Sequence, residues 1–169
     1  MIVVVMGVSG SGKTVVGAAL AASLGWPFLD GDDFHPPANV AKMASGTPLV
    51  DADRWPWLDR IAGEMAAVLA SGGNAVVACS ALRQAYRDRL AAAARAPGDV
   101  RFVYLKGDFD MIAARLAARK HRYMPATLLA SQFATLEEPP DAIVVDAGAA
   151  IADEVASIRE RLAAAAVQA

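Results

Sequence analysis

The sequence of 169 residues has only one cysteine, and it lacks both an excess of basic residues and a long apolar run. Cys79 has no second cysteine with which to form a disulfide within the chain, which favours a reducing compartment. Sixteen Lys and Arg residues against 18 Asp and Glu residues give a net charge of −2, so nucleic acid is not expected as the main partner. The apolar runs stay far below the roughly 20 residues that span a bilayer, and the run at residues 2–6 is too short for a signal peptide. We therefore expect a cytoplasmic protein that binds neither nucleic acid nor a membrane.

Hydrophobic residues make up 56% of the chain, although aromatic residues make up only 7%. Much of the apolar content is alanine, as at residues 91–94 and 163–166, and alanine has the highest helix propensity. The length suits a single core, and no repeat or linker-like change of composition divides the chain. We therefore expect one helix-rich domain over residues 1–169.

Apolar runs typical of strands alternate with helical patterns along the chain. The predicted strands are residues 2–6, 27–30, 75–79, 100–105 and 142–146. The predicted helices are residues 14–24, 57–70, 84–94, 111–118, 126–136 and 151–165. Strands that are continuously apolar are buried on both faces, which indicates a parallel sheet covered by helices. The alternation predicts a three-layer α/β/α fold with a five-stranded parallel sheet.

A glycine-rich loop that binds phosphate follows the first predicted strand. It has the pattern G-x-x-x-x-G-K-[ST] and consists of Gly7, Val8, Ser9, Gly10, Ser11, Gly12, Lys13 and Thr14. In such loops the backbone N–H groups and the N-terminus of the next helix surround a polyphosphate. Lys13 is placed to reach the β- and γ-phosphates, and the Thr14 hydroxyl to hold Mg²⁺. Because a strand and a helix flank the loop, we interpret it as a nucleoside triphosphate site rather than a chance glycine-rich turn.

Polar residues also follow the second and third predicted strands, where ligands bind in open α/β sheets. Asp30 and Asp32 lie at the end of the second strand, and Ser80 and Arg83 follow the third. We expect Asp30 to bind Mg²⁺ through a water molecule. We expect Asp32 to orient and deprotonate an acceptor hydroxyl. The alternative for this pair is a solvated acidic turn. Cys79 ends an apolar strand and is expected to be a buried structural thiol.

The segment at about residues 31–58 is rich in proline, polar side chains and tryptophan, which predicts an acceptor-binding region. Arg54 is the best candidate to bind an anion, because its planar guanidinium matches a carboxylate. Alternatively, Arg54 pairs with Asp51 or Asp53. The two tryptophans of the segment are expected in the core, and His35 is expected to form hydrogen bonds or to pack rather than act as a base.

A cluster of cationic residues at about 115–125 predicts a lid that closes over the phosphates and excludes water. Arg115 and Arg119 lie four residues apart on one helical face, so they can converge. An ordinary solvated basic face is the alternative. Gln132, in the next predicted helix, either packs or reaches the active site.

The chain resembles the small gluconokinases of the phosphate-loop type. The resemblance rests on residues 7–14, on Asp-Gly-Asp-Asp-Phe-His-Pro (30–36), on Asp-Arg-Trp-Pro-Trp-Leu (53–58), on Cys-Ser-Ala-Leu-Arg (79–83) and on Ser-Gln-Phe-Ala-Thr-Leu-Glu-Glu-Pro (131–139). It implies phosphorylation of D-gluconate at the 6-hydroxyl with ATP and Mg²⁺. It also implies a homodimer, and a fold akin to shikimate and nucleoside-monophosphate kinases with a helical acceptor-binding region and a lid.

The resemblance further implies which residues act. The implied substrate residues are Asp32, His35, Asn39, Lys42, Arg54, Ser80, Arg83, Arg122 and Gln132, and the implied catalytic residues are Lys13, Asp32 and Arg119. The chain departs from the family pattern in the predicted lid, where His121 stands in place of a glycine and Arg122 in place of a histidine.

Two alternative functions stay open from the sequence. One is a kinase for another small hydroxy acid or polyol, such as shikimate, although shikimate kinases have a glycine-rich stretch where this chain has Ser80-Ala81-Leu82. The other is a nucleotide-dependent regulatory ATPase without a small acceptor. The guanine-reading pattern Asn-Lys-x-Asp of GTPase switches is absent.

Overall fold

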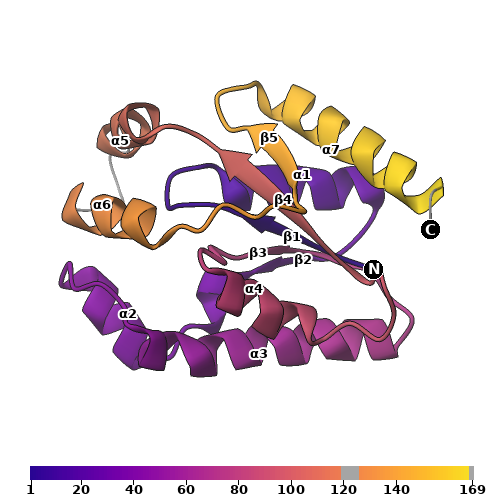
Figure 1. The fold of residues 1–169 in the computed structure, drawn as a ribbon, viewed down its shortest axis with the longest axis horizontal. Coiled ribbons are helices and arrows are strands. Elements are labelled where there is room, and N and C mark those ends of the chain that lie inside the picture. The colour runs from indigo at the N-terminus through magenta and orange to yellow at the C-terminus, as the bar shows by residue number, and fades with distance from the viewer. Residues whose placement is uncertain (119–125, 168–169) are drawn as a thin grey trace.

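The computed structural model describes residues 1–118 and 126–167, and it contains one parallel sheet of five strands (Figure 1). The strand order is β2-β3-β1-β4-β5, and every neighbouring pair is parallel. The strands are β1 (Ile2–Met6), β2 (Phe28–Asp30), β3 (Ala75–Ala78), β4 (Val100–Lys106) and β5 (Ile143–Asp146). The sheet agrees with the prediction in strand number and direction, and each bound lies within one residue of the predicted one.

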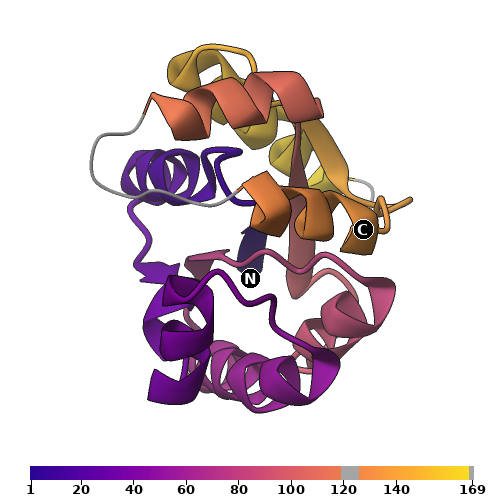
Figure 2. The ribbon, with the colours of Figure 1, turned by 90° about the vertical axis from the view of Figure 1, so that its left-hand side faces the viewer.

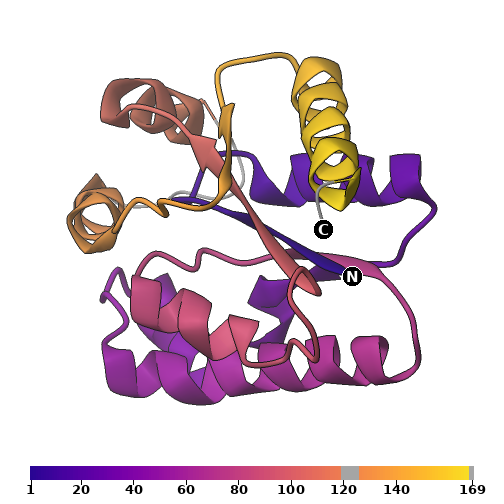
Figure 3. The ribbon, with the colours of Figure 1, turned by 45° about the vertical axis from the view of Figure 1, so that its right-hand side comes forward.

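Helices cover both faces of the sheet, as Figure 3 shows. On one face lie α1 (Lys13–Leu24) and α7 (Ile151–Val167); on the other lie α3 (Asp51–Ala70) and α4 (Gln84–Ala91). Alternate residues of β1 point to opposite layers: Val3 and Val5 pack with α1 and α7, whereas Val4 and Met6 pack with α3 and α4. All five residues of β1 are fully buried, which explains why the strand is continuously apolar. The three-layer α/β/α fold is therefore confirmed.

The remaining helices gather at the carboxyl end of the strands. They are α2 (Pro37–Ala44), α5 (Phe109–Ala117) and α6 (Ala126–Thr135), together with the short 3₁₀ helix η1 (Gly31–Phe34). Figure 2 looks onto this end and shows α6 between the layer of α1 and α5 and the layer of α2 and α3. A small apolar cluster joins these parts: Val8, Leu82, Ile112, Leu116 and Leu129.

The segment between β2 and β3 contains more helix than the sequence pattern predicted. Neither η1 nor α2 was predicted, and α3 begins at Asp51 instead of residue 57. The early start has a local cause, because the Asp53 carboxylate accepts a hydrogen bond from the Val50 N–H at 2.9 Å and so caps the helix. The proline at position 56 lies inside the helix rather than at its boundary.

Gly31, the first residue of η1, is a position where any side chain would collide with the sheet. A Cβ atom there would lie 2.4 Å from the backbone oxygen of Ala78 and 3.2 Å from Ile61 Cδ1. We expect Gly31→Ala to lower the free energy of unfolding by about 1–3 kcal/mol, because backbone atoms cannot give way as a flexible side chain can. Urea denaturation followed by circular dichroism measures this change.

Gly63 supplies the matched control for that substitution. It is exposed on α3, and a Cβ atom there would meet nothing within 4 Å. Gly63→Ala is therefore expected to raise the free energy of unfolding by about 0.5–1 kcal/mol, since glycine is a poor helix former. A Gly31→Ala protein as stable as the unmodified protein would contradict the close approach to β3.

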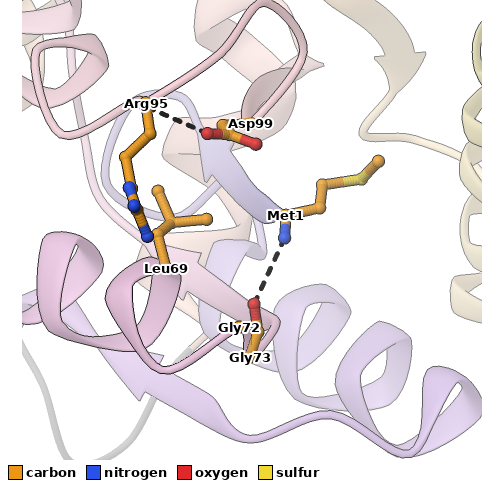
Figure 4. Close-up of a pocket in the computed structure, with 6 residues that line it drawn as sticks. All are labelled: Met1, Leu69, Gly72, Gly73, Arg95 and Asp99. Atoms are coloured by element: carbon orange, nitrogen blue, oxygen red, sulfur yellow. Dashed lines mark hydrogen bonds between the residues drawn. The ribbon is translucent and has the colours of Figure 1, made fainter.

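A pocket lies at the amino end of the strands (Figure 4), lined by Met1, Leu69, Gly72, Gly73, Arg95 and Asp99. The amino group of Met1 and the carboxylate of Asp99 both have partners here. The amino group of Met1 donates to Asn74 Oδ1 at 2.6 Å and to the Gly73 oxygen at 3.3 Å, and the Asp99 carboxylate accepts the Arg95 N–H at 2.9 Å. The hydrogen bonds of Met1 therefore link the start of β1 to the residues directly before β3. In the part of the chain that the structure describes, no helix is both long enough and apolar enough to cross a membrane.

Candidate active site

The carboxyl ends of β1, β2 and β3 bring the predicted donor and acceptor residues to one place. Asp30 pairs in register with Ala78, and Ala78 pairs in register with Val5. The phosphate loop follows β1, the Asp30–Asp32 turn ends β2 and Ser80 follows β3. The Gly7 N–H donates to the Ser80 oxygen at 3.3 Å, which links the phosphate loop to the loop after β3.

The phosphate loop has a backbone that only glycine readily adopts. Gly7, Gly10 and Gly12 have φ angles of +143°, +85° and +103°. Gly12 precedes α1, and within the described residues no side chain caps this helix N-terminus and no acidic residue lies in its first turn. The first N–H groups of α1 therefore point to a region suited to an anion such as a polyphosphate. The buried Ser11 hydroxyl, which lacks a hydrogen-bond partner among the described residues, adds a further polar group to the loop.

Two oxygen groups stand beside the loop where a divalent cation would be needed. The Thr14 hydroxyl donates to Asp30 Oδ2 at 3.0 Å, so a hydroxyl and a carboxylate are adjacent. Mg²⁺ prefers oxygen ligands and keeps several waters, using one or two protein groups plus substrate phosphates. Over residues 1–118 and 126–167 no group of three or more His, Cys, Asp or Glu side chains could hold a metal. The pair therefore fits a cation held mainly by phosphates and water.

The Asp32 carboxylate points outward while its backbone is held in place. The Asp32 N–H donates to Asp30 Oδ1 at 3.0 Å, and the Asp32 side chain is 61% exposed. Because the turn is fixed through the backbone, the carboxylate of Asp32 is available to a ligand. Asp33, the next residue, is also exposed.

His35 is held from several sides and stacks on the buried ring of Trp57 at 4.2 Å. Its Nδ1 contacts Asn39 Nδ2 at 3.3 Å, and its Nε2 lies 3.9 Å from Asp32 Oδ1. Burial lowers the pKa of His35, with Asp32 opposing and Arg54 adding to the shift, so the imidazole is mainly neutral at pH 7. These contacts suit an orienting neighbour of Asp32.

Two other predicted substrate residues stabilise the acceptor segment itself. Asn39 is buried and donates to the Asp53 oxygen at 2.9 Å. Lys42 Nζ contacts both carboxylate oxygens of Asp53 at 2.8 and 2.9 Å. The hydrogen bonds from Lys42 and from the Val50 N–H hold the pKa of Asp53 below its usual value. Asn39 and Lys42 thus dock α2 against the start of α3.

Arg54 and Arg83 converge on one internal carboxylate, that of Asp51. Arg83 Nη1 lies 3.0 and 3.3 Å from the two oxygens of Asp51, and Arg54 Nη1 lies 3.9 Å from Oδ1. The Tyr86 hydroxyl accepts from Arg54 at 3.1 Å and donates to Asp51. Two guanidinium groups facing one carboxylate leave a net charge of +1, which suits a second, external carboxylate. The alternative that Arg54 pairs with Asp51 therefore describes only part of its surroundings.

The structure also contains a positioning residue to which the sequence pattern assigned no role. Arg87 is buried on α4 and donates to the oxygens of Ala81 and Leu82 at 3.0 and 3.2 Å. Ala81 has a φ of +44°, so Arg87 stabilises an unusual turn directly before Arg83. The signals in the sequence were its place one helical turn after Arg83 and its place in Tyr86-Arg87-Asp88, which accompanies the family motif at residues 79–83. Cys79 is buried, and burial raises the pKa of its thiol to about 12, as suits a structural residue.

The lid residues remain predictions from the sequence, because Arg119 and Arg122 lie outside the described residues. Gln132 reaches the phosphate loop: its Oε1 accepts a hydrogen bond from the Ser9 N–H at 2.6 Å. Lys13 Nζ donates to the Val8 oxygen at 2.9 Å, so this ammonium lies within the loop.

A parallel five-stranded sheet whose first strand leads through this loop into a helix defines a P-loop nucleotide-binding fold of the three-layer type. Residues 2–139 match the AAA domain family. The chain is 48% identical over 141 residues to gluconokinase of Gluconobacter oxydans, which covers 82% of this chain and 76% of the relative. It is 44% identical over 163 residues to the thermoresistant gluconokinase of Escherichia coli, covering 94% and 91%. The chain therefore belongs to the gluconokinase family and is an enzyme of the kinase class.

Solved structures agree with this assignment. The crystal structure of a gluconokinase from Sinorhizobium meliloti 1021 is 44% identical, has a TM-score of 0.89, and covers 98% of this chain and 93% of that chain. A shikimate kinase from Aquifex aeolicus has a TM-score of 0.67 at 14% identity, which is a likeness of fold alone. The resemblance stated from the sequence motifs is thereby confirmed.

Proposed function

We propose that this protein transfers the γ-phosphoryl group of ATP to the 6-hydroxyl of D-gluconate, yielding 6-phospho-D-gluconate and ADP. The observation that carries the proposal is the 44–48% identity to gluconokinases over 76–91% of their lengths. The geometry of the site supports it, because the carboxyl end of the strands brings together the phosphate loop, the Asp30–Asp32 turn and the Arg54–Arg83 pair.

The donor half of the site consists of the phosphate loop and the Thr14–Asp30 pair. The loop N–H groups bind the phosphates, and Lys13 stabilises the charge on the transferring group. Thr14, directly, and Asp30, through water, would hold Mg²⁺, which when bound neutralises phosphate charge. Arg119 and Arg122 are proposed, from the sequence pattern, to act from a lid at about residues 115–125.

The acceptor half begins at Asp32. In the proposed step the 6-hydroxyl oxygen of gluconate forms a bond to the γ-phosphorus, while the bond from that phosphorus to the β–γ bridging oxygen breaks. Asp32 accepts the hydroxyl proton, and ADP leaves with the bridging oxygen. His35 Nε2 lies 3.9 Å from Asp32 Oδ1, so the imidazole stands beside the carboxylate that takes this proton.

The carboxylate of gluconate is proposed to bind at Arg54 and Arg83. Asp51 and Tyr86 hold both guanidinium groups in place, and the group keeps a net positive charge for the substrate. Ser80 lies at the border of the donor and acceptor halves, where its backbone oxygen accepts the Gly7 N–H, and the neighbouring hydroxyls of gluconate need such a polar residue. On the family relationship we also propose that the protein is a cytoplasmic homodimer.

An acceptor panel tests this function. In a coupled assay of ADP release with ATP and Mg²⁺, we expect turnover to be fast with gluconate and absent with shikimate. Glucitol, which has the hydroxyls but no carboxylate, is expected to react poorly because Arg54 and Arg83 then have no anion to bind. Turnover of another acid but not of gluconate would contradict the substrate, and ATP hydrolysis unaffected by any acid would favour the regulatory ATPase.

The same panel on Arg54→Met tests the carboxylate subsite. We expect the KM for gluconate to rise about 10- to 100-fold, since a hydrogen bond to a charged group contributes about 1.5–3 kcal/mol. Arg60→Met is the matched control, because Arg60 is an exposed arginine of the same helix. An unchanged KM in Arg54→Met would remove Arg54 from the subsite.

A further inference from the structure

The contact between Ser9 and Gln132 joins two segments that lie 123 positions apart in the sequence. The Ser9 N–H donates to Gln132 Oε1 at 2.6 Å, and the contact is partly buried. Ser9 lies in the phosphate loop, and Gln132 lies in α6, the helix that follows the predicted lid. An amide side chain at this distance is well placed to restrain the loop.

The hydrogen bond from Ser9 to Gln132 fixes the N–H side of the Val8–Ser9 peptide group. The Ser9 N–H and the Val8 C=O belong to the same planar peptide unit. Gln132 holds the N–H end, while the Val8 oxygen accepts the Lys13 ammonium at 2.9 Å and the Ser11 N–H at 3.2 Å. The orientation of this peptide therefore decides where the loop presents a carbonyl to Lys13.

The segment directly after α6 is hydrogen-bonded to the loop after β3 and to the start of α4. The Glu137 N–H donates to the Leu82 oxygen at 2.8 Å, and the Glu137 carboxylate accepts the Gln84 N–H at 2.7 Å. Leu129 of α6 packs in the apolar cluster with Val8 and Leu82. The helix thus spans from the phosphate loop to the loop after β3.

We propose that Gln132 is a positioning residue of the donor site, which holds the Val8–Ser9 peptide in the orientation that binds the triphosphate. This assignment rests on the part of the proposed function that places ATP at the phosphate loop. It goes beyond that function in giving Gln132 a role towards the enzyme backbone instead of towards gluconate. A fixed peptide has less conformational freedom to lose when the nucleotide binds, so affinity is higher.

Gln132→Leu and Gln132→Met remove the acceptor oxygen and keep a side chain of similar length or bulk. We expect either variant to raise the Kd of a nonhydrolysable ATP analogue with Mg²⁺ by about 3- to 10-fold, the value of one hydrogen bond. Calorimetry measures this Kd. Amide hydrogen exchange by NMR should show faster exchange of the Ser9 N–H in both variants.

Gln132→Glu provides the rescue, because it retains an acceptor oxygen and should keep the Ser9 amide protected. Thr135→Val is the control on the same helix, since the Thr135 hydroxyl bonds only within α6, to the Ser131 oxygen at 2.8 Å. Its analogue Kd and Ser9 exchange are expected to match the unmodified protein. A purely structural role would lower the melting temperature and leave both readouts unchanged, and this result would overturn the proposal.

The two readouts need no acceptor. If gluconate proves not to be the substrate, Ser9 exchange and analogue binding still report on Gln132. If gluconate is the substrate but the two variants bind the analogue within twofold of the unmodified protein, the role of Gln132 alone is wrong.

Discussion

Replacing Asp32 by alanine is expected to lower kcat for gluconate by about 10²–10⁴, the range that a general base contributes. The physical reason is that the Asp32 carboxylate is exposed at the end of β2, next to the Thr14–Asp30 pair, and in the proposed mechanism it accepts the hydroxyl proton. The assay is ADP release at saturating ATP and gluconate. The KM values should change little, because the loss falls on the transition state.

Two further variants make the Asp32 result interpretable. Asp32→Asn keeps the size and the backbone contact to Asp30 but removes the basic oxygen, so it should lose nearly as much activity as the alanine variant. Asp33→Ala removes the neighbouring exposed carboxylate and should keep near-normal turnover. Near-normal turnover in Asp32→Ala would show that another group activates the hydroxyl.

Lys13→Met is expected to lower kcat by about 10²–10³, because in the proposed mechanism the Lys13 ammonium stabilises the charge that develops on the transferring phosphoryl group. In the structure Lys13 Nζ lies against the Val8 oxygen at 2.9 Å, inside the glycine loop. Methionine keeps the length of the side chain without its charge, so the packing of α1 should survive. Steady-state kinetics at saturating substrates measure the loss.

Removal of a surface cation outside the site distinguishes the effect of Lys13 on kcat from the effect of a changed net charge. Arg89 lies on α4 and pairs with Asp59 at 3.0 Å on the exposed surface. Surface ion pairs contribute about 0–1 kcal/mol, so Arg89→Met should barely alter stability or kcat. An equal loss of kcat in both variants would mean that Lys13 has no special role at the phosphates.

The strands and the donor loop were predictable because their signals are local. β1 is a run of five apolar residues, and it is buried on both faces as that pattern requires. The glycine loop follows it within one residue, and its glycines have the positive φ angles that the pattern demands. Neither feature depends on a distant part of the chain.

The acceptor segment was predictable only in outline. Its polar residues after β2 predict an acceptor-binding region, but its helices were not predicted, because α2 is a short helix of eight residues that packing must stabilise. Within it, Lys42 and Asp53 are 11 residues apart, and their pairing follows from the way α2 lies against α3. Arg83 and Asp51 are 32 residues apart and meet only because α3 and α4 cover the same face of the sheet.

The sequence by itself determined the order of the strands along the chain, the phosphate loop and the kinase family, because each depends on neighbouring residues or on a motif of fixed spacing. Only the tertiary structure decided that Asp51 holds two arginines together and that Gln132 holds the Ser9 N–H. These contacts join residues from separate elements, and side-chain hydrogen bonds have a reach of about 3 Å. Such short contacts form only where the packed sheet and helices bring both partners to the same place at the carboxyl end of the strands.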